Sequence, residues 1–394
     1  MNYPRGRFLV PWSSGLPPLQ RTGTTRTPNP HPGADVLRPN LTSTATPDAI
    51  EWPAPQRRQA FNHWLDSLAA PHGLIAGSLS SASSDASFRR YFRIDTAGGP
   101  TCIVMDAPPP QEDVRQFVDV ASRLERAGLN APRILAQDSG HGFLLLTDLG
   151  TRLYLGELLA ARTTGDTHTV QTLMRDAIGA LVQWQSRGDS TGLPPYDDAL
   201  LRRELALFPD WCVEREFALR WSDAQRQVWD TACDALVASA LAQTRVAVHR
   251  DYMPRNLMLA SPNPGILDFQ DAVHGPISYD IASLLRDAFI SWDEDLEIDW
   301  AVRYWEAARE AGLMLPADFG EFWRQLEWMG LQRHLKVLGI FCRLKHRDAK
   351  PKYSEDLPRF FNYAHKVAAR YSALRPLARL LEPLMGAERR EVFC

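Results

Sequence analysis

Lysine is missing from most of this 394-residue chain, since none occurs before Lys336. The charges nevertheless nearly balance, and the formal net charge is −3. A general nucleic-acid-binding protein would show an excess of basic residues on one face, so the charge balance argues against that class. Any phosphate contact in the first 335 residues has to come from arginine, hydroxyl or backbone groups.

Cysteine is also scarce, and no long apolar run is present. The five cysteines are scattered and lack C-x-x-C spacing, so we expect free thiols in a reducing compartment, with neither a disulfide frame nor a zinc site. No run approaches the ~18 apolar residues of a membrane span. We expect a cytoplasmic protein without a membrane or obligate protein partner. The cysteines are Cys102, Cys212, Cys233, Cys342 and Cys394.

Residues 1–50 differ from the rest of the chain. They hold nine prolines, many Thr and Ser, and only two acidic residues. Such a segment buries too little apolar surface to offset the entropy of ordering. It also has no apolar block typical of a secretory signal. We therefore predict a disordered Pro/Thr-rich extension.

Periodicity divides the remaining sequence into two parts. Residues 51–150 are expected to form a small β-rich lobe, and residues 151–394 a larger, mostly helical lobe. The first part is predicted to contain helices over 57–70 and 112–127 and strands over 88–94, 102–105, 133–137 and 142–147. Helices are predicted in the second part over 169–187, 198–208, 223–243, 278–290, 297–311, 318–346 and 355–382.

The most informative segment lies between Val246 and Asp280. An apolar strand (246–248) leads into His249 and Asp251, and Asn256 follows five positions later. A second apolar strand (265–267) leads into Asp268. The order H-x-D-x4-N followed by a strand-borne Asp is the layout of a phosphoryl-transfer site.

The residue types suit that chemistry. Asp251 can accept the proton of an attacking hydroxyl, and Asn256 with Asp268 can supply oxygen ligands to Mg²⁺. His249 is expected to brace the loop, and it is included with Asp251 as a catalytic residue. The alternative is a His and an Asp on a plain loop with Asn256 capping a helix, but it leaves Asp268 unexplained.

These motifs resemble the aminoglycoside phosphotransferase-like family, the small-molecule branch of the protein-kinase-like fold. Its H-x-D-x4-N catalytic loop, its (I/L)-D-(F/W) metal loop and the following G-x-P-x-x-D-(I/L)-A all have counterparts here, the last at 275–282. The resemblance implies an α+β, bilobal kinase-like fold that uses ATP and Mg²⁺. It also implies that Asp280 supports the catalytic loop, although a plain N-cap role is compatible with the sequence.

A narrower resemblance concerns amino-sugar kinases of bacterial cell-wall recycling. It is carried by SDASFRRYFR (84–93), VMDAPP (104–109), GFLLLTDLG (142–150), ELALFPDW (204–211) and FQDAVHGPISYD (269–280). This branch phosphorylates the anomeric hydroxyl of N-acetylmuramate or N-acetylglucosamine. The resemblance therefore implies a small sugar substrate and a sugar 1-phosphate product in peptidoglycan recycling.

The phosphate-binding features depart from the usual kinase pattern. The loop around Ser84 lacks G-x-G-x-x-G, and Met105-Asp106 stands where kinases carry a phosphate-pairing Lys. We predict that arginine replaces this lysine, because a guanidinium can bind two phosphate oxygens at once. Ser84 and the loop backbone are expected to approach the phosphates. The candidate arginines are Arg89, Arg90 and Arg93. Each could equally lie on a solvated strand face.

The remaining site residues are predicted from position and chemistry. Backbone groups at Thr147 and Leu149 are expected to meet the adenine edge. Sugar sites often pair an acid with an aromatic ring, so Glu204, Trp211 and Asp271 are candidate substrate-binding residues. Trp211 could instead be a core tryptophan.

Other functions remain open at this level. The substrate could be another alcohol, such as an aminoglycoside, choline, homoserine or thiamine. The missing Lys and glycines also allow a catalytically inactive nucleotide-binding protein, although such a protein would be expected to lose Asp251, Asn256 or Asp268. A protein kinase is disfavoured because no A-P-E follows Asp268.

Overall fold

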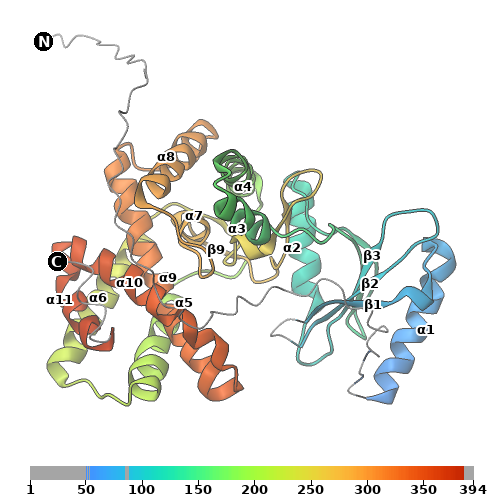
Figure 1. Cartoon of the computed structure of the whole chain (residues 1–394), viewed down its shortest axis with the longest axis horizontal. Coiled ribbons are helices and arrows are strands. Elements are labelled where there is room, and N and C mark those ends of the chain that lie inside the picture. Colours follow the sequence, from blue (N-terminus) through green and yellow to red (C-terminus); the bar gives the residue numbers. More distant parts are fainter. Residues whose placement is uncertain (1–49, 51, 53, 85–87, 386–394) are drawn as a thin grey trace, which may run out of the picture. The chain divides into compact units, whose positions relative to one another are not determined.

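The computed structural model describes residues 50, 52, 54–84 and 88–385 (Figure 1). The predicted disordered extension therefore lies outside the described residues, apart from Ile50. Residues 85–87 of the serine-rich loop also lie outside them.

A five-stranded antiparallel sheet forms the first part of the described chain. Its strand order is β1-β2-β3-β5-β4, and Figure 1 shows helix α1 beside it. Helix α2 connects β3 to β4. The elements are α1 (Pro55–His72), η1 (Ala76–Ser78), β1 (Ser80–Ser84), β2 (Arg90–Ile94), β3 (Cys102–Asp106), α2 (Val114–Arg126), β4 (Ile134–Asp138) and β5 (Phe143–Thr147).

The two faces of this sheet pack on different partners, because neighbouring side chains of a strand point to opposite faces. On one face, Phe92 and Val104 pack with Phe61 of α1 in a separate apolar cluster. On the other face, Met105 and Leu144 belong to a large core that also contains residues of α2 and of the helical region. A side chain on the first face is therefore turned away from α2.

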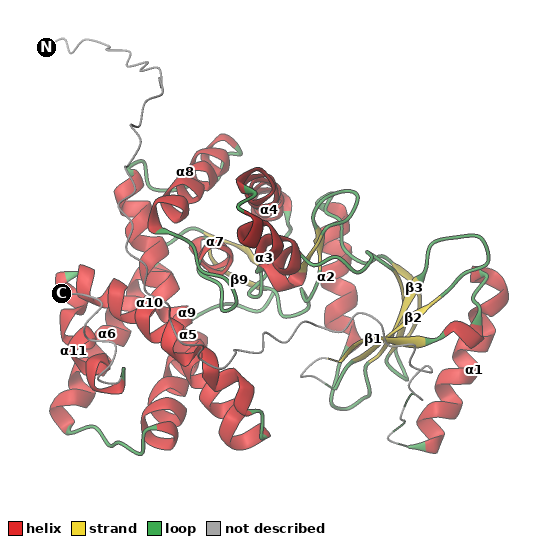
Figure 2. Cartoon of the chain, in the orientation of Figure 1, coloured by secondary structure: helices red, strands yellow, loops and turns green. Residues whose placement is uncertain are grey.

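Helices dominate the chain after Thr147, as the colouring in Figure 2 shows. Local signals set their starts: Ser222 and Gln225 form a reciprocal capping box at α6, and Asp318 caps α9. The α-helices are α3 (Tyr154–Thr164), α4 (Thr167–Arg187), α5 (Asp198–Leu207), α6 (Asp223–Leu241), α7 (Ser278–Leu285), α8 (Glu294–Glu310), α9 (Phe319–Asp348), α10 (Leu357–Arg370) and α11 (Arg375–Leu381). Shorter helical segments are η2 (Phe208–Glu216, a π-helix), η3 (Pro254–Asn256), η4 (Pro351–Asp356), η5 (Ser372–Leu374) and η6 (Glu382–Leu384).

Two short antiparallel strand pairs hold the loops that carry the sequence motifs. Strand β6 (Arg245–Val248) pairs with β9 (Val273–Pro276), and β7 (Leu257–Met258) pairs with β8 (Gly265–Ile266). The first pair anchors the start of the His249 loop and the end of the Asp268 loop. The second pair anchors their other ends, so the two loops are held next to each other.

The predicted α+β class is confirmed, because an antiparallel sheet precedes a mostly helical region. The prediction missed β1, α3, β7 and β9, and it placed one helix over 355–382. That segment breaks between α10 and α11, where Pro376 in the first turn of α11 cannot supply the N–H that a continuous helix needs. The helix predicted over 278–290 ends at Leu285.

All described residues fall within one compact unit, so the predicted lobe boundary at 150 stays a prediction. Among these residues, no helix is at once long enough and apolar enough to cross a lipid bilayer.

Candidate active site

Both motif loops carry an unusual backbone conformation. Arg250 has φ +76° and Asp268 has φ +59°, a left-handed region that non-glycine residues rarely adopt. Such strain persists only where surrounding contacts enforce it, and it gathers at functional sites. The strain at Arg250 and Asp268 therefore points to both loops as candidate functional positions.

Asp280 enforces the conformation of the first loop. Its side chain is fully buried, and its two oxygens accept hydrogen bonds from the backbone N–H groups of His249 (2.7 Å) and Arg250 (2.9 Å). Burial raises the pKa of Asp280 to about 7, against the effect of these two donors, which favour the ionised form. Asp280 lies inside the first turn of α7, and Ile277 occupies the N-cap position. The contacts therefore match the predicted supporting role.

His249 is buried beneath the loop. Its Nδ1 accepts a hydrogen bond from the backbone N–H of Asp251 at 3.3 Å. Burial lowers the pKa of His249 to about 4, so the ring is neutral near pH 7. A neutral, buried imidazole suits the bracing role predicted for His249, and a proton-carrying role is not needed.

The structure brings Asp251, Asn256 and Asp268 together. The Asn256 side-chain amide donates to the backbone carbonyl of Asp251 at 2.9 Å and lies 3.5 Å from the Asp268 carboxylate. Asp268 also accepts a hydrogen bond from Gln270 at 2.9 Å. Asp251 itself is half-buried and forms no ion pair with any described residue. Asn256 therefore contacts both the backbone of Asp251 and the side chain of Asp268, which joins the two loops.

The donor set fits Mg²⁺ better than a transition metal. Within the part of the chain that the structure describes, no group of three or more His, Cys, Asp or Glu residues could hold a metal ion. Mg²⁺ usually keeps several waters and binds through one or two protein oxygens together with substrate phosphates. Because the Asn256 amide nitrogen faces Asp251 and Asp268, its Oδ1 is directed elsewhere and can act as a ligand beside the Asp268 carboxylate.

A cavity of about 790 Å³ lies beside these loops, in the size range of small-molecule sites. Residues of α2, α5 and α9 line it together with the loop that follows Asp268. Two predicted substrate-binding residues, Glu204 and Asp271, are in its wall.

Glu204 is almost fully buried, and its carboxylate is already engaged. Arg250 Nη2 lies 2.7 Å and Lys336 Nζ 2.8 Å from its Oε1, and the Tyr196 hydroxyl donates to its Oε2. Burial alone would raise the pKa of Glu204, but the two cations outweigh it and lower the pKa. Glu204 therefore holds two cations at the cavity wall, and its predicted contact with a sugar stays a prediction.

Lys336 and Arg250 also line the cavity, and neither was predicted as a site residue. Burial lowers the pKa of Lys336, but Tyr279 and Glu204 outweigh that effect, so the ammonium stays charged. Two signals were visible in the sequence: Arg250 lies between His249 and Asp251, and Lys336 is the first lysine of the chain. Neither signal indicated that a helix starting at Phe319 would reach the catalytic loop.

Trp211 lies in the π-helix η2 and packs half-buried against the helical core. It is not among the described residues that line the cavity. This position agrees with the alternative of a core tryptophan, and the predicted sugar-stacking contact has no support from the cavity wall.

The candidate phosphate-binding arginines are all paired with carboxylates. Arg90 and Arg57 hold the buried Asp106 between them. Asp106 and Arg90 are cross-strand partners, and Arg90 lies over the ring of Trp52, on the α1 face of the sheet. That face is turned away from α2, which argues against the predicted phosphate contact of Arg90.

Arg89 and Arg93 occupy other positions. Arg89 Nε lies 3.2 Å from a Glu112 oxygen, and Arg93 donates to both Asp148 oxygens and to the Gly150 carbonyl. Arg93 thus ties β2 to the end of β5. A phosphate contact of Arg89 remains a prediction.

The last predicted cofactor-binding residues lie at strand ends. Ser84 is the final residue of β1 and pairs with Arg90 in the β1–β2 register. Thr147 ends β5, where its N–H and hydroxyl both bond to the Arg133 backbone. Leu149 follows, half-buried. Their predicted nucleotide contacts remain predictions.

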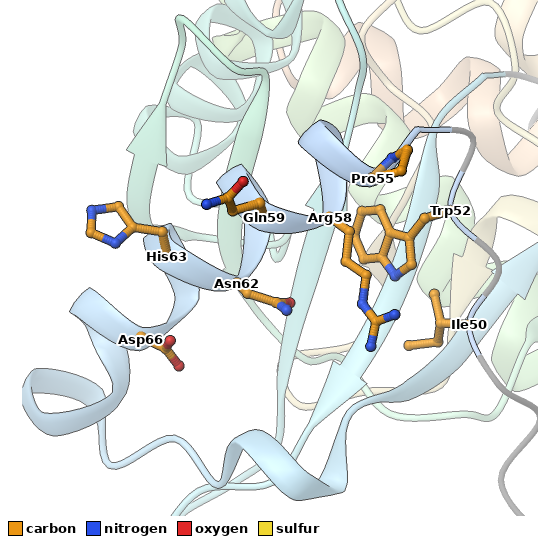
Figure 3. A pocket seen from close by; sticks show the side chains of 8 residues that line it. All are labelled: Ile50, Trp52, Pro55, Arg58, Gln59, Asn62, His63 and Asp66. Carbon is orange, nitrogen blue, oxygen red and sulfur yellow. The ribbon is translucent and has the colours of Figure 1, made fainter.

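A second cavity, of about 730 Å³, lies against the outer side of α1 (Figure 3). Its wall includes Trp52, Arg58, Asn62 and Asp66. None of the predicted site residues lines it, so it is separate from the candidate active site.

Comparison with known proteins gives close relatives. The sequence pattern of a phosphotransferase enzyme family matches residues 78–318. The chain is 51% identical over 314 residues to an N-acetylmuramate/N-acetylglucosamine kinase of Pseudomonas putida, covering 80% of this chain and 90% of the relative. It is 50% identical over 341 residues to the Pseudomonas aeruginosa protein of the same name, covering 84% and 98%.

Similarity to solved structures is confined to the fold. A Plasmodium vivax ethanolamine kinase superposes with a TM-score of 0.53 at 9% sequence identity, covering 73% of this chain and 82% of that one. The bilobal kinase-like fold class is therefore confirmed, and this likeness carries no information on the substrate.

Proposed function

This chain belongs to the phosphotransferase enzyme family, and we propose that it is an ATP- and Mg²⁺-dependent kinase that phosphorylates the anomeric hydroxyl of N-acetylmuramate and N-acetylglucosamine. The family resemblance predicted from the motifs is confirmed. The sugar assignment is supported by two relatives of that name at about 50% identity over most of the chain.

Asp251 is assigned as the general base. As the sugar hydroxyl attacks the γ-phosphorus, its proton passes to the Asp251 carboxylate, an oxygen–phosphorus bond forms and the bond to the β-phosphate oxygen breaks. The products are a sugar 1-phosphate and ADP. Asp251 forms no ion pair with any described residue, and His249 and Asp280 hold the backbone of its loop.

Asn256 and Asp268 are assigned to hold Mg²⁺, which would neutralise charge on the nucleotide's phosphates. Gln270 fixes one Asp268 oxygen, and the Asn256 amide nitrogen is fixed by Asp251. Fixing the ligands before binding reduces the ordering that the metal nucleotide has to impose.

The observation that carries this proposal is the hydrogen bond from Asn256 to Asp251, with Asp268 next to it. The Asn256 amide thus connects the loop of the proposed base, Asp251, to Asp268, the second proposed metal ligand. A decayed, inactive nucleotide-binding protein would have no reason to keep this arrangement. Kinases for other alcohols, including aminoglycosides, choline and homoserine, share the chemistry and differ in the cavity wall.

A cytoplasmic location is also proposed, since the substrate class and ATP are intracellular. All four described cysteines are buried free thiols, which suits a reducing compartment.

The deciding experiment measures ADP release with N-acetylmuramate, N-acetylglucosamine, kanamycin, choline and homoserine as acceptors, using Asp251→Asn as the blank. We expect turnover with the two amino sugars only. The position of the phosphate is then read by ³¹P–¹H correlation. Phosphate on the 6-hydroxyl, or turnover with choline and not with the sugars, would contradict the proposal.

A further inference from the structure

The cavity beside the catalytic loop contains two arginines without a carboxylate partner. Of the cations in its wall, Arg250 and Lys336 are paired with Glu204, and Arg115 with Asp113. Arg203 and Arg343 form no ion pair with any described residue. The same wall contains four carboxylates beside its five cations, so the positive excess is one charge. A guanidinium that no carboxylate pairs with is suited to binding an anionic ligand.

Arg343 is the more informative of the two. It is partly buried, and its Nε is buried without a hydrogen-bond partner among the described residues. Burial and the neighbouring Arg347 lower the pKa of Arg343, and Asp348 partly offsets them. Its Nη1 and Nη2 are not buried and make no hydrogen bond with a described residue, so they are the donors that a ligand in the cavity can reach.

Helix periodicity places the two arginines around an apolar strip. On α9, Lys336, Ile340 and Arg343 are spaced i, i+4 and i+7, so they share one face, and all three line the cavity. On α5, Arg203 and Leu207 are likewise one turn apart and line the same cavity. The wall therefore offers two guanidinium groups with Leu207 and Ile340 next to them.

The two helices approach closely at this wall. A methyl group on Gly339 would lie 2.4 Å from the Leu207 carbonyl oxygen, so only glycine allows α9 to pack this near the end of α5. The close approach brings Leu207 of α5 beside the face of α9 that carries Ile340 and Arg343.

The two sugars in the proposed function differ in one group. N-acetylmuramate carries a lactyl ether, with a methyl and an ionised carboxylate, where N-acetylglucosamine has a hydroxyl. Resting on the proposed function, we propose that Arg343, assisted by Arg203, binds this carboxylate while Leu207 and Ile340 contact the methyl group. These residues thereby favour N-acetylmuramate over N-acetylglucosamine. A guanidinium suits the role because its fork matches both carboxylate oxygens.

The test compares kcat/KM for both sugars in the wild type, Arg343→Gln and Arg203→Gln. We expect Arg343→Gln to lower the N-acetylmuramate to N-acetylglucosamine ratio about 10- to 100-fold, mainly through a higher KM for N-acetylmuramate. A smaller drop in the same ratio is expected for Arg203→Gln. Arg347→Gln is the matched control, because Arg347 lies one turn further on α9, is exposed and is paired with Asp348.

The methyl ester of N-acetylmuramate removes the charge from the ligand side. The wild type should prefer the acid to the ester, and Arg343→Gln should lose that preference. Equal losses with both sugars, or an undiminished acid preference in Arg343→Gln, would overturn this inference. If the wild type phosphorylates neither sugar, the proposed function fails first, and the two failures are thus distinguishable.

Discussion

The carboxylates of the sheet region and those of the His249 and Asp268 loops differ in whether they form ion pairs. Asp106 and Asp148 in the sheet region are held by arginines, through Arg57 and Arg90 for the first and Arg93 for the second. Asp251 and Asp271, on the loops, form no ion pair with any described residue. Ion pairs in the sheet region thus join secondary-structure elements, whereas Asp251 and Asp271 take part in no such pair with a described residue.

The same contrast applies to arginine. Before the structure is seen, any arginine near the serine-rich loop is a plausible replacement for the missing lysine. In the structure, Arg57 connects α1 to β3, Arg90 connects β2 to β3, and Arg93 connects β2 to the end of β5. Surplus cations lie instead in the cavity, on α5 and α9. Charge type alone therefore does not separate structural from ligand-binding arginines.

The largest effect is expected from replacing Asp251, a loop carboxylate that forms no ion pair with any described residue. Asp251→Ala should lower kcat about 10²- to 10⁴-fold, the usual contribution of a general base, while nucleotide affinity stays near that of the wild type. Steady-state kinetics and nucleotide titration measure the two effects. Asp299→Asn, on the exposed face of α8, is the matched control. Wild-type turnover in Asp251→Ala would remove Asp251 from the mechanism.

Replacing Asp106, a carboxylate that is paired with two arginines, should lower the stability of the fold. Asp106→Ala leaves Arg57 and Arg90 without their buried partner, and we expect a loss of about 3 kcal/mol in the free energy of unfolding. Denaturant unfolding measures it. Because Arg90 faces α1, the KM for ATP of the folded variant should change little. A large rise in the KM for ATP without loss of stability would instead indicate that Arg90 contacts the phosphates.

His249 links the catalytic loop to a pH effect on stability. Its pKa falls from the ordinary 6.5 to about 4 on folding, so between these values the unfolded chain binds a proton that the folded chain does not. The contribution of His249 to the free energy of unfolding is therefore complete above pH 6.5. It falls by about 3 kcal/mol as the pH drops toward 4. Buried Asp280 has the opposite shift and opposite slope.

The comparison of wild type with His249→Gln separates these two contributions, since Asp280 is present in both. Unfolding free energies measured from pH 7 to pH 4 should converge as the pH falls, because only the wild type loses the histidine contribution. Parallel curves would show that folding does not shift the pKa of His249.

The smallest expected effect concerns the metal. Asp268→Asn should weaken Mg²⁺-dependent nucleotide binding by about tenfold or more. Changing a residue that only supports a metal ligand already costs about that much in metal affinity. Titration of nucleotide binding at several Mg²⁺ concentrations gives the shift. The same titration on the Asp299→Asn control should match the wild type. An unchanged Mg²⁺ dependence in Asp268→Asn would remove this side chain from the metal site.

Local sequence predicted which residues of the candidate site would lie near one another. The spacing from His249 to Asn256 and the strand before Asp268 identified groups that the structure places together. Asp280 was assigned its supporting role by resemblance, and its two backbone contacts agree with that role. These inferences worked because each residue lies a few positions from a strand or helix end, where local sequence decides direction.

Long-range partners were not accessible in the same way. Arg90 and Asp106 are cross-strand neighbours whose shared face depends on register, and Lys336 reaches Glu204 from a helix more than a hundred residues away. Trp211 lies in a π-helix and does not line the cavity, and no simple sequence pattern predicts such a helix.

The amino-acid sequence by itself determined the candidate reacting groups, because residue types suited to phosphoryl transfer occur at short, characteristic spacings along one segment. Tertiary structure alone decided which charged groups are neutralised and which stay available. That distinction depends on distances between side chains that are far apart in the chain, and packing between sheet, helices and loops sets those distances.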